Sequence, residues 1–385
     1  MASHKPATGL LFTLLMFPQI AETIYSPALT DIAHHFATPE QAAAQTLSIY
    51  FIAFALGVGF WGGMADRIGR RSAMLWGLGL YSLSAAAALI VDQFETLLLV
   101  RALSAFGAAV GSVVTQTMLR DIYSGSDLAK IFAVMGLGMA ISPVLGFFAG
   151  GLLTALGGYL GVFIGLLVMS TALLGLCAKQ LPETRPPKLN AVAFKTLASQ
   201  LARDGCVLRH MALVALFNLM LFSYYSLAPF LFESLGYSSV EFGYSGVILA
   251  MGSLTGSLLN QAGLKRGIPP SHMIRAGIGM ATLGGLGVLL TQKTLWFLAP
   301  MSLALMSYSI AIPNILSLAL VRYRANAGAA GALFGLVYYL LLGIGLVASG
   351  WLQNLGAILL SAASGCLLLY ARTPTGKHER VENSA

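Results

Sequence analysis

The chain has 385 residues, of which 57% are hydrophobic and only 9% are charged, against about 25% charged in an ordinary soluble domain. This composition excludes a water-soluble fold, because there is too little polar surface to cover one. The net charge of +8 invites a nucleic-acid partner, while three scattered cysteines are too few for a disulfide framework or a zinc site.

Twelve apolar stretches follow one another along the chain, and each has about the 20 residues that an α-helix needs to cross a bilayer. None alternates with a period of two, which excludes a transmembrane β-barrel. The first is too long for a signal-peptide core and has no small-residue cleavage site after it, so we expect it to be retained. The predicted spans are residues 9–30, 45–65, 72–92, 96–118, 130–154, 158–178, 211–232, 240–263, 272–292, 295–318, 328–350 and 352–371.

The lysines and arginines predict the orientation of these spans. If both termini lie in the cytoplasm, all 22 basic residues except Lys293 and Arg101 fall on the cytoplasmic side, as the positive-inside rule requires. The same asymmetry explains the basic net charge without any nucleic acid. We therefore expect a multi-pass protein of a bacterial-type inner membrane, in contact with lipid, and a monomer.

The longest polar stretch, residues 179–210, separates six spans from six others. This layout is typical of transporters built from two parallel halves. It predicts a six-helix bundle over residues 1–178, a cytosolic linker over 179–210, a second six-helix bundle over 211–371 and a cytosolic tail over 372–385. A short echo links the halves: Tyr-Ser-Pro at residues 25–27 and Tyr-Ser-Leu-Ala-Pro at 225–229.

The segment GGMADRIGRR (residues 62–71) joins the second and third spans. Read alone, it is either a positive-inside loop with helix caps or a tight turn in which Asp66 pairs with an arginine one turn later. It resembles the G-x-L-A-D-R-x-G-R-[RK] signature of the major facilitator superfamily, with Met64 in place of leucine. In that family the motif belongs to a cytosolic gate that stabilises the outward-open state. The resemblance assigns to this gate Gly62, Asp66, Arg67, Gly69, Arg70, Arg71 and Asp121.

Arg101 lies within the fourth span, where a charge normally faces a cavity or a partner. The stretch RALSAFGAA resembles the family's R-x-x-Q-G-x-G-A-A motif, with Ser104 and Ala105 at the positions of glutamine and glycine. The alternative is an arginine near the end of its helix that extends to the lipid headgroups.

In the fifth span, GMAISPVLG (residues 138–146) spaces small residues for close helix packing around a proline kink. It resembles the antiporter motif G-x-x-x-G-P-x-x-G of the family's exporters, and this resemblance implies export rather than uptake. The residues that carry it are Gly138, Ser142, Pro143 and Gly146, with Ser142 in place of the second glycine.

The first span, PQIAETIYSPALTDIA (residues 18–33), resembles the first helix of the multidrug resistance protein D and Bcr/CflA group of drug:proton antiporters. Arg-Asp-Ile-Tyr at residues 120–123 and the glycine-rich start of the eleventh span also fit this group. Glu22 stands where a neutral residue is common.

Glu22 is the only carboxylate that we place inside a span. At 1.5 Å per residue it lies about 12 Å from the outer end of its helix, and Arg101 lies about 8 Å from its own outer end. The depths allow a direct or a water-mediated pair. Burial favours the neutral acid and a nearby guanidinium favours the carboxylate, so Glu22 is the predicted proton carrier. A structural ion pair that never titrates is the alternative, and Asp31 is the next acid along the helix.

Polar and aromatic side chains within otherwise apolar spans usually face the interior of a bundle. A mostly apolar cavity with a few hydrogen-bonding groups would suit amphipathic organic substrates. For each residue, helix–helix packing is an equally good reading. The candidate cavity residues are Gln19, Tyr25, Tyr50, Gln116, Asn218, Tyr224, Tyr225, Asn314, Tyr338 and Tyr339.

We therefore expect a proton-coupled secondary active exporter of small amphipathic or hydrophobic compounds, of the drug-efflux type, working by alternating access. The alternatives are a dedicated exporter of one metabolite, such as a siderophore or a sugar, a membrane-embedded enzyme, and a non-transporting receptor. No phosphate-binding loop or catalytic motif is present, so we expect no enzyme and no cofactor beyond the proton gradient. His34 and His35 are expected to be solvated rather than to bind a metal.

Overall fold

The computed structural model describes residues 7–186 and 194–371, and over these ranges it contains helices and no strands. The predicted all-α membrane fold is confirmed. The predicted tail over 372–385, part of the linker, and Lys5, Lys188, Arg372, Lys377 and Arg380 of the orientation argument lie outside the described residues.

The first half of the chain contains the helices α1 to α6. Its first span is interrupted, because α1 stops at Thr23 and a 3-10 turn with Pro27 near its start leads into α2. α6 consists of two helices that cross the bundle in turn, joined by a tight turn at Gly157 and Gly158, where Gly158 has a φ of 60°. The elements are α1 (Thr8–Thr23), η1 (Ser26–Ala28), α2 (Leu29–His35), α3 (Glu40–Ile68), α4 (Arg70–Ala87), η2 (Ala88–Ile90), α5 (Phe94–Ile122) and α6 (Gly125–Gln180).

The second half begins after a short amphipathic linker helix, α7 (Phe194–Arg203), which the sequence did not predict. α8 starts at Gly205 rather than near residue 211, because the Asp204 carboxylate caps it by accepting from the N–H groups of Cys206 and Val207. The elements are α8 (Gly205–Ser234), α9 (Ser239–Lys265), α10 (Pro270–Thr291), η3 (Leu295–Phe297), α11 (Leu298–Ala319), η4 (Val321–Asn326), α12 (Ala327–Leu352) and α13 (Leu355–Ala371).

Nine of the described helices are long and apolar enough to cross a membrane. α6 counts once among them although it covers the predicted fifth and sixth spans. The predicted first and twelfth spans correspond to the interrupted α1–α2 segment and to α13, which has 17 residues. Together these helices account for all twelve predicted spans.

The outer surface of the bundle is apolar. Trp76, Ile90 and Trp296 have 70%, 81% and 77% of their surface exposed, and many leucines are similarly placed. A contiguous apolar surface of this kind promotes aggregation in water, whereas it is normal for a protein surrounded by lipid. The chain is a multi-pass membrane protein.

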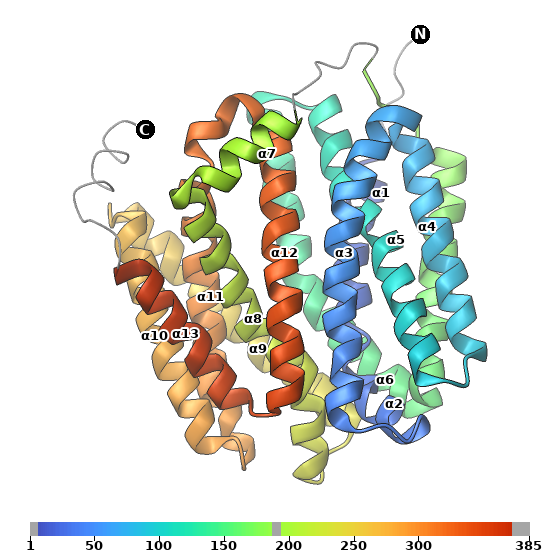
Figure 1. The fold of residues 1–385 in the computed structure, drawn as a ribbon, viewed down its shortest axis with the longest axis vertical. Helices are drawn as coiled ribbons and strands as arrows, with labels where there is room; N and C mark the ends of the chain where they lie inside the picture. The colour runs from blue at the N-terminus through green and yellow to red at the C-terminus, as the bar shows by residue number, and fades with distance from the viewer. Residues whose placement is uncertain (1–6, 187–193, 372–385) are drawn as a thin grey trace.

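The helices run along one common direction, with α7 at one end of the bundle and α2 at the other (Figure 1). We call the end that carries α7 and the described linker residues 181–186 the linker end, and the other the opposite end. α1 starts and α13 finishes at the linker end. The helices α1–α6 form one half and α8–α13 the other, and the halves meet where α3 packs along α12 and α6 along α9.

Glycines let α6 approach α1 closely. A Cβ atom added at Gly146 would overlap the Thr23 hydroxyl and lie 3.0 Å from the Ile24 nitrogen, and one added at Gly150 would overlap the Ile24 carbonyl. Thr23 is held in place because its hydroxyl donates to the Gln19 carbonyl at 2.7 Å. The two helices therefore touch backbone to backbone, without room for a single methyl group.

We predict that Gly146→Ala alone lowers stability by about 1–3 kcal/mol, because the methyl group overpacks this contact. Gly79→Ala is the matched control in α4, since its Cβ would meet no atom within 4 Å and alanine is the better helix former. Thermal unfolding of the purified proteins in detergent measures both. Equal melting temperatures for the two variants would contradict the close approach.

Candidate functional site

A charged cluster lies at the linker end, where α3, α4 and α5 meet. The Arg70 side chain is only 2% exposed, its Nε lies 2.9 Å from Asp121 Oδ2, and its Nη1 lies 2.5 Å from Asp66 Oδ1. Asp121 is 12% exposed and Asp66 is 54% exposed. The planar guanidinium has donors on two sides, so one arginine joins the ends of three helices. The structure thus brings together three of the predicted gate residues.

The linker binds to the same cluster, a contact that the sequence did not predict. The Glu183 carboxylate accepts hydrogen bonds from the backbone N–H of Arg70 at 2.8 Å and of Arg71 at 3.2 Å, at the first turn of α4. A carboxylate at this position also interacts favourably with the helix dipole. Gly69 precedes this turn with a φ of 97°, and a Cβ there would overlap Glu183. Glycine is therefore required at position 69 for both reasons.

The remaining predicted gate residues surround this contact. The Arg67 carbonyl accepts from Arg185 Nη1 at 2.9 Å, and Arg71 Nη2 donates to the Ala178 carbonyl at 2.7 Å. Gly62 faces Val113 of α5, 3.6 Å from where its Cβ would be. These contacts fasten the start of the linker to the first half of the chain.

The predicted antiporter segment forms the face of α6 that packs on α1. Gly138 lies against Phe12 and Met16, while Gly146 lies against Thr23. Ser142, which replaces a glycine of the motif, donates its hydroxyl to the Gly138 carbonyl at 2.8 Å and therefore needs no partner on another helix. Pro143 stands inside the helix next to it. The whole segment controls how closely α6 and α1 approach.

Arg101 is buried deep in the first half. Its side chain has no exposed surface, so it does not extend to the lipid headgroups. The guanidinium carbon lies 3.8 Å above the centre of the Tyr25 ring and 4.6 Å from that of Tyr50. Within the described part of the chain its three nitrogens have no hydrogen-bond partner in good geometry, although the Tyr81 hydroxyl interacts with the guanidinium. Aromatic faces attract the cation, but they leave its donors free.

Glu22 is half-buried, and no direct ion pair joins it to Arg101 among the described residues, although the two interact electrostatically. The direct form of the expected pair is thus not seen, and the water-mediated form stays a prediction. The same carboxyl group is within electrostatic range of Tyr50 in one half and of Tyr225 and Tyr339 in the other. Glu22 therefore lies within electrostatic range of side chains from both halves.

Tyr308 of α11 also lies near Glu22, and the sequence did not predict it. It interacts electrostatically with Glu22, and its hydroxyl donates to Asn218 Oδ1 at 3.2 Å. It satisfies the same criterion as the predicted cavity residues, a polar aromatic side chain within an apolar span. The rings of Tyr338 and Tyr339 contact one another with centres 4.2 Å apart and planes tilted by 34°.

Other predicted cavity residues serve helix packing in this structure. The Tyr224 hydroxyl bonds Ser245 Oγ at 2.6 Å between α8 and α9, and Asn314 donates to Asn260 Oδ1 at 2.7 Å between α11 and α9. All four of these side chains are buried. Gln116 donates to Ser112 Oγ one turn earlier at 3.4 Å. Gln19, like Glu22, is half-buried.

Asp31 lies at the opposite end and has a backbone partner. Its Oδ2 accepts from the N–H of Tyr159 at 2.5 Å, directly after the turn at Gly158, so that it caps the second crossing of α6. Asp31 thus has a structural role, at a site distinct from that of Glu22.

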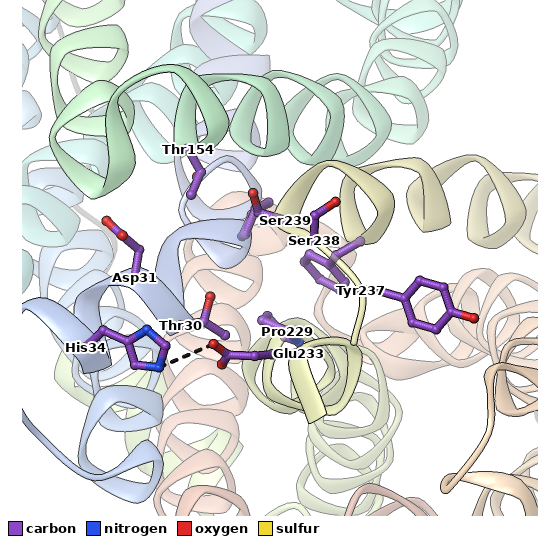
Figure 2. Close-up of a pocket in the computed structure, with 11 residues that line it drawn as sticks. Thr30, Asp31, His34, Thr154, Pro229, Glu233, Tyr237, Ser238 and Ser239 are labelled. Carbon is purple, nitrogen blue, oxygen red and sulfur yellow. Dashed lines mark ion pairs between the residues drawn. The ribbon is translucent and has the colours of Figure 1, made fainter. Parts of the chain in front are cut away.

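A cavity of about 270 Å³ opens at the opposite end between the two halves, and Asp31 is one of its lining residues (Figure 2). Thr30, Asp31 and His34 approach it from the first half, and Glu233, Ser238 and Ser239 from the second. His34 Nε2 lies 3.2 Å from Glu233 Oε1 across the mouth, with the two side chains 72% and 39% exposed. His34 and His35 are both exposed, and among the described residues no group of three or more potential ligands is placed to hold a metal ion.

Comparisons with known proteins agree with these features. The family model of the Major Facilitator Superfamily matches residues 11–348. An "Uncharacterized transporter" of Rickettsia bellii is 30% identical over 355 residues, covering 88% of each chain. "Multidrug resistance protein D" of Escherichia coli is 30% identical over 192 residues, covering 49% of each chain. The crystal structure of a D-xylose-proton symporter shares the fold, with a TM-score of 0.75, 15% identity and coverage of 95% of this chain and 97% of that chain. The predicted resemblance to the drug:proton antiporter group is confirmed.

We predict that Asp121→Asn lowers stability more than Asp66→Asn. Both acids pair with the buried Arg70, but the Asp121 side chain is itself only 12% exposed, and removing one member of a buried pair costs about 3 kcal/mol. Asp66 is half exposed, so water competes for its carboxylate and its loss should cost less, about 1 kcal/mol. Asp127→Asn is the control, because Asp127 pairs with Lys130 at a fully accessible site. Denaturant unfolding in detergent gives the ranking, and a larger loss for Asp66→Asn would contradict it.

Proposed function

The chain belongs to the major facilitator superfamily and is a membrane transporter, and from this premise we propose that it is a proton-coupled exporter of small amphipathic organic compounds. The observation that carries the proposal is the position of Glu22. It is a half-buried carboxyl group at the seam between the halves, in electrostatic contact with Arg101 and with tyrosines of both halves. A carboxyl group at this seam can be reached from either side of the membrane in turn as the halves move.

The proposed orientation places the linker end in the cytoplasm. The basic residues Arg67, Arg71 and Arg185 all lie there, which is the side that the positive-inside rule assigns to them. With this orientation the halves are in contact on the outer side of a bacterial inner membrane. The His34–Glu233 contact then joins the halves on the outer side, and the start of α1 and the end of α13 lie on the cytoplasmic side.

The proposed coupling is a competition at Glu22. In the outward-facing state the carboxyl group takes up a proton and the substrate leaves, and in the inward-facing state substrate binding accompanies release of that proton to the cytoplasm. Each charge that crosses 100 mV supplies about 2.3 kcal/mol for this exchange. Arg101 favours the charged form of the carboxyl group, so the proton can be released inside.

The proposed substrate class follows from the side chains around Glu22. Tyr225, Tyr308 and Tyr339 offer flat apolar faces with hydroxyl groups at their rims, a lining that suits organic molecules with both apolar and polar parts. The direction of transport rests on the Gly138–Gly146 segment and its likeness to the antiporter motif. The relative named multidrug resistance protein D supports efflux of this kind.

We predict that Glu22→Gln abolishes proton-driven efflux of an amphipathic dye from cells and its proton-driven uptake into inside-out vesicles, because glutamine cannot exchange a proton. Binding of the dye to the purified protein, followed by its effect on thermal stability, should persist within a few-fold. Glu95→Gln is the control, since Glu95 is an exposed acid in the first turn of α5.

Full proton-driven efflux by Glu22→Gln would overturn the coupling proposal. A comparison of metabolites in the culture medium with and without the protein tests its substrate class. One specific compound lost from the medium, together with no dye efflux by the unmodified protein, would instead make the chain an exporter of a single metabolite.

A further inference from the structure

The polar contacts that join the two halves gather toward the opposite end. The exposed His34–Glu233 pair bridges the mouth of the cavity, and Gln45 Nε2 donates to the Val347 carbonyl at 3.2 Å. Exposed ion pairs contribute little because water competes for both charges. Buried hydrogen bonds between the halves must therefore contribute most of the polar stabilisation of the closed end.

One of the buried contacts is made by Ser26. Its hydroxyl donates to the backbone carbonyl of Tyr225, across the seam from η1 to α8, and both residues are buried. In an uninterrupted helix the Tyr225 carbonyl would accept from the N–H of residue 229. That residue is Pro229, which has no N–H, so α8 leaves this carbonyl without a donor of its own.

An unpaired carbonyl in the dry interior of a membrane protein is costly. While the halves are closed at this end, Ser26 supplies the missing hydrogen bond. When they part, water reaches the carbonyl and replaces the serine. The free carbonyl that the proline creates thus makes the closed form dependent on one hydroxyl group of the other half.

A second serine makes the reciprocal contact. Ser226 of α8 donates to the Ala44 carbonyl of α3 at 3.4 Å, and both residues are buried. The Tyr-Ser-Pro and Tyr-Ser-Leu-Ala-Pro segments that echo one another in the sequence therefore lie together at the seam, and each serine donates to the backbone of the opposite half. Ala44 keeps the N–H of Ser48 as its helical donor, so this second bond is the less critical of the two.

We propose that Ser26 and the proline-freed carbonyl of Tyr225 form the latch that closes the opposite end of the transporter. The proposal rests on alternating access from the preceding section but not on proton coupling or on any substrate. Breaking this one bond should shift the population toward the form that is open at the opposite end, without unfolding either half.

The test measures the distance between two spin labels, at Gln93→Cys in the first half and Ser234→Cys in the second, in full-length protein whose three native cysteines are replaced by alanine. Both positions are exposed and lie at the opposite end. Ser26→Ala leaves the carbonyl unpaired in the closed form only, so the ratio of open to closed molecules should rise about tenfold or more.

Two further variants make the result specific. Pro229→Ala gives α8 its own donor for the Tyr225 carbonyl, so adding Ser26→Ala to Pro229→Ala should change the open-to-closed ratio less than threefold. Ser223→Ala is the matched control, since this buried serine bonds Ser349 at 2.9 Å within the second half and should leave the ratio unchanged.

An unchanged distance distribution in folded Ser26→Ala would overturn the latch. So would an equal effect of Ser26→Ala with and without Pro229, because serine would then act through packing alone. The readout uses no substrate and no proton gradient, so failure of the proposed export would leave this result unaffected, and the reverse also holds.

Discussion

Inside a bilayer every backbone N–H and C=O needs a partner from the protein itself, because the lipid supplies none. In this chain that requirement is met by ordinary helices over most of the length, and the places where a helix stops or is interrupted carry the informative side chains. The Ser26 hydroxyl donates to the Tyr225 carbonyl that Pro229 leaves free, and the Asp31 carboxylate accepts from the N–H of Tyr159. The Glu183 carboxylate accepts from the first turn of α4. Each of these groups joins two segments that are distant in the sequence.

The two buried arginines show how differently one side chain can be used. Arg70 is almost fully enclosed and satisfied by two carboxylates, so it acts as a fixed joint between helices. Arg101 is equally buried but lies between tyrosine rings with unpaired donors, next to a carboxyl group that it does not touch. A fully paired arginine is most stable in the arrangement seen here. The free energy of a buried cation without partners falls when water or a partner reaches it. This contrast favours Arg70 for architecture and Arg101 for transport.

Sequence reasoning recovered the features that depend on local pattern. Span positions follow from apolar length, and the division into two halves follows from the polar stretch before α8. Asp66 and Arg70 were grouped by one motif, and Asp121 was added to them by the resemblance to the family's gate. It failed where the rotation and tilt of helices decide. For Tyr224 and Asn314 it left packing and a cavity open, and the structure shows both bonded to a neighbouring helix, while Tyr308 was overlooked although it lies within electrostatic range of Glu22. The contact of Ser26 with Tyr225 joins residues 199 positions apart and has no signal in spacing beyond a three-residue echo.

The turn at Gly157 and Gly158 leaves almost no loop between the fifth and sixth spans. Two apolar helices joined by so short a turn form a helical hairpin, and we expect the pair to enter the membrane together. The hairpin then docks on a span made long before it, since the carboxylate that receives the Tyr159 N–H belongs to α2. The last hairpin of the first half is thus fastened to the segment that follows its first helix, and we expect it to complete that half.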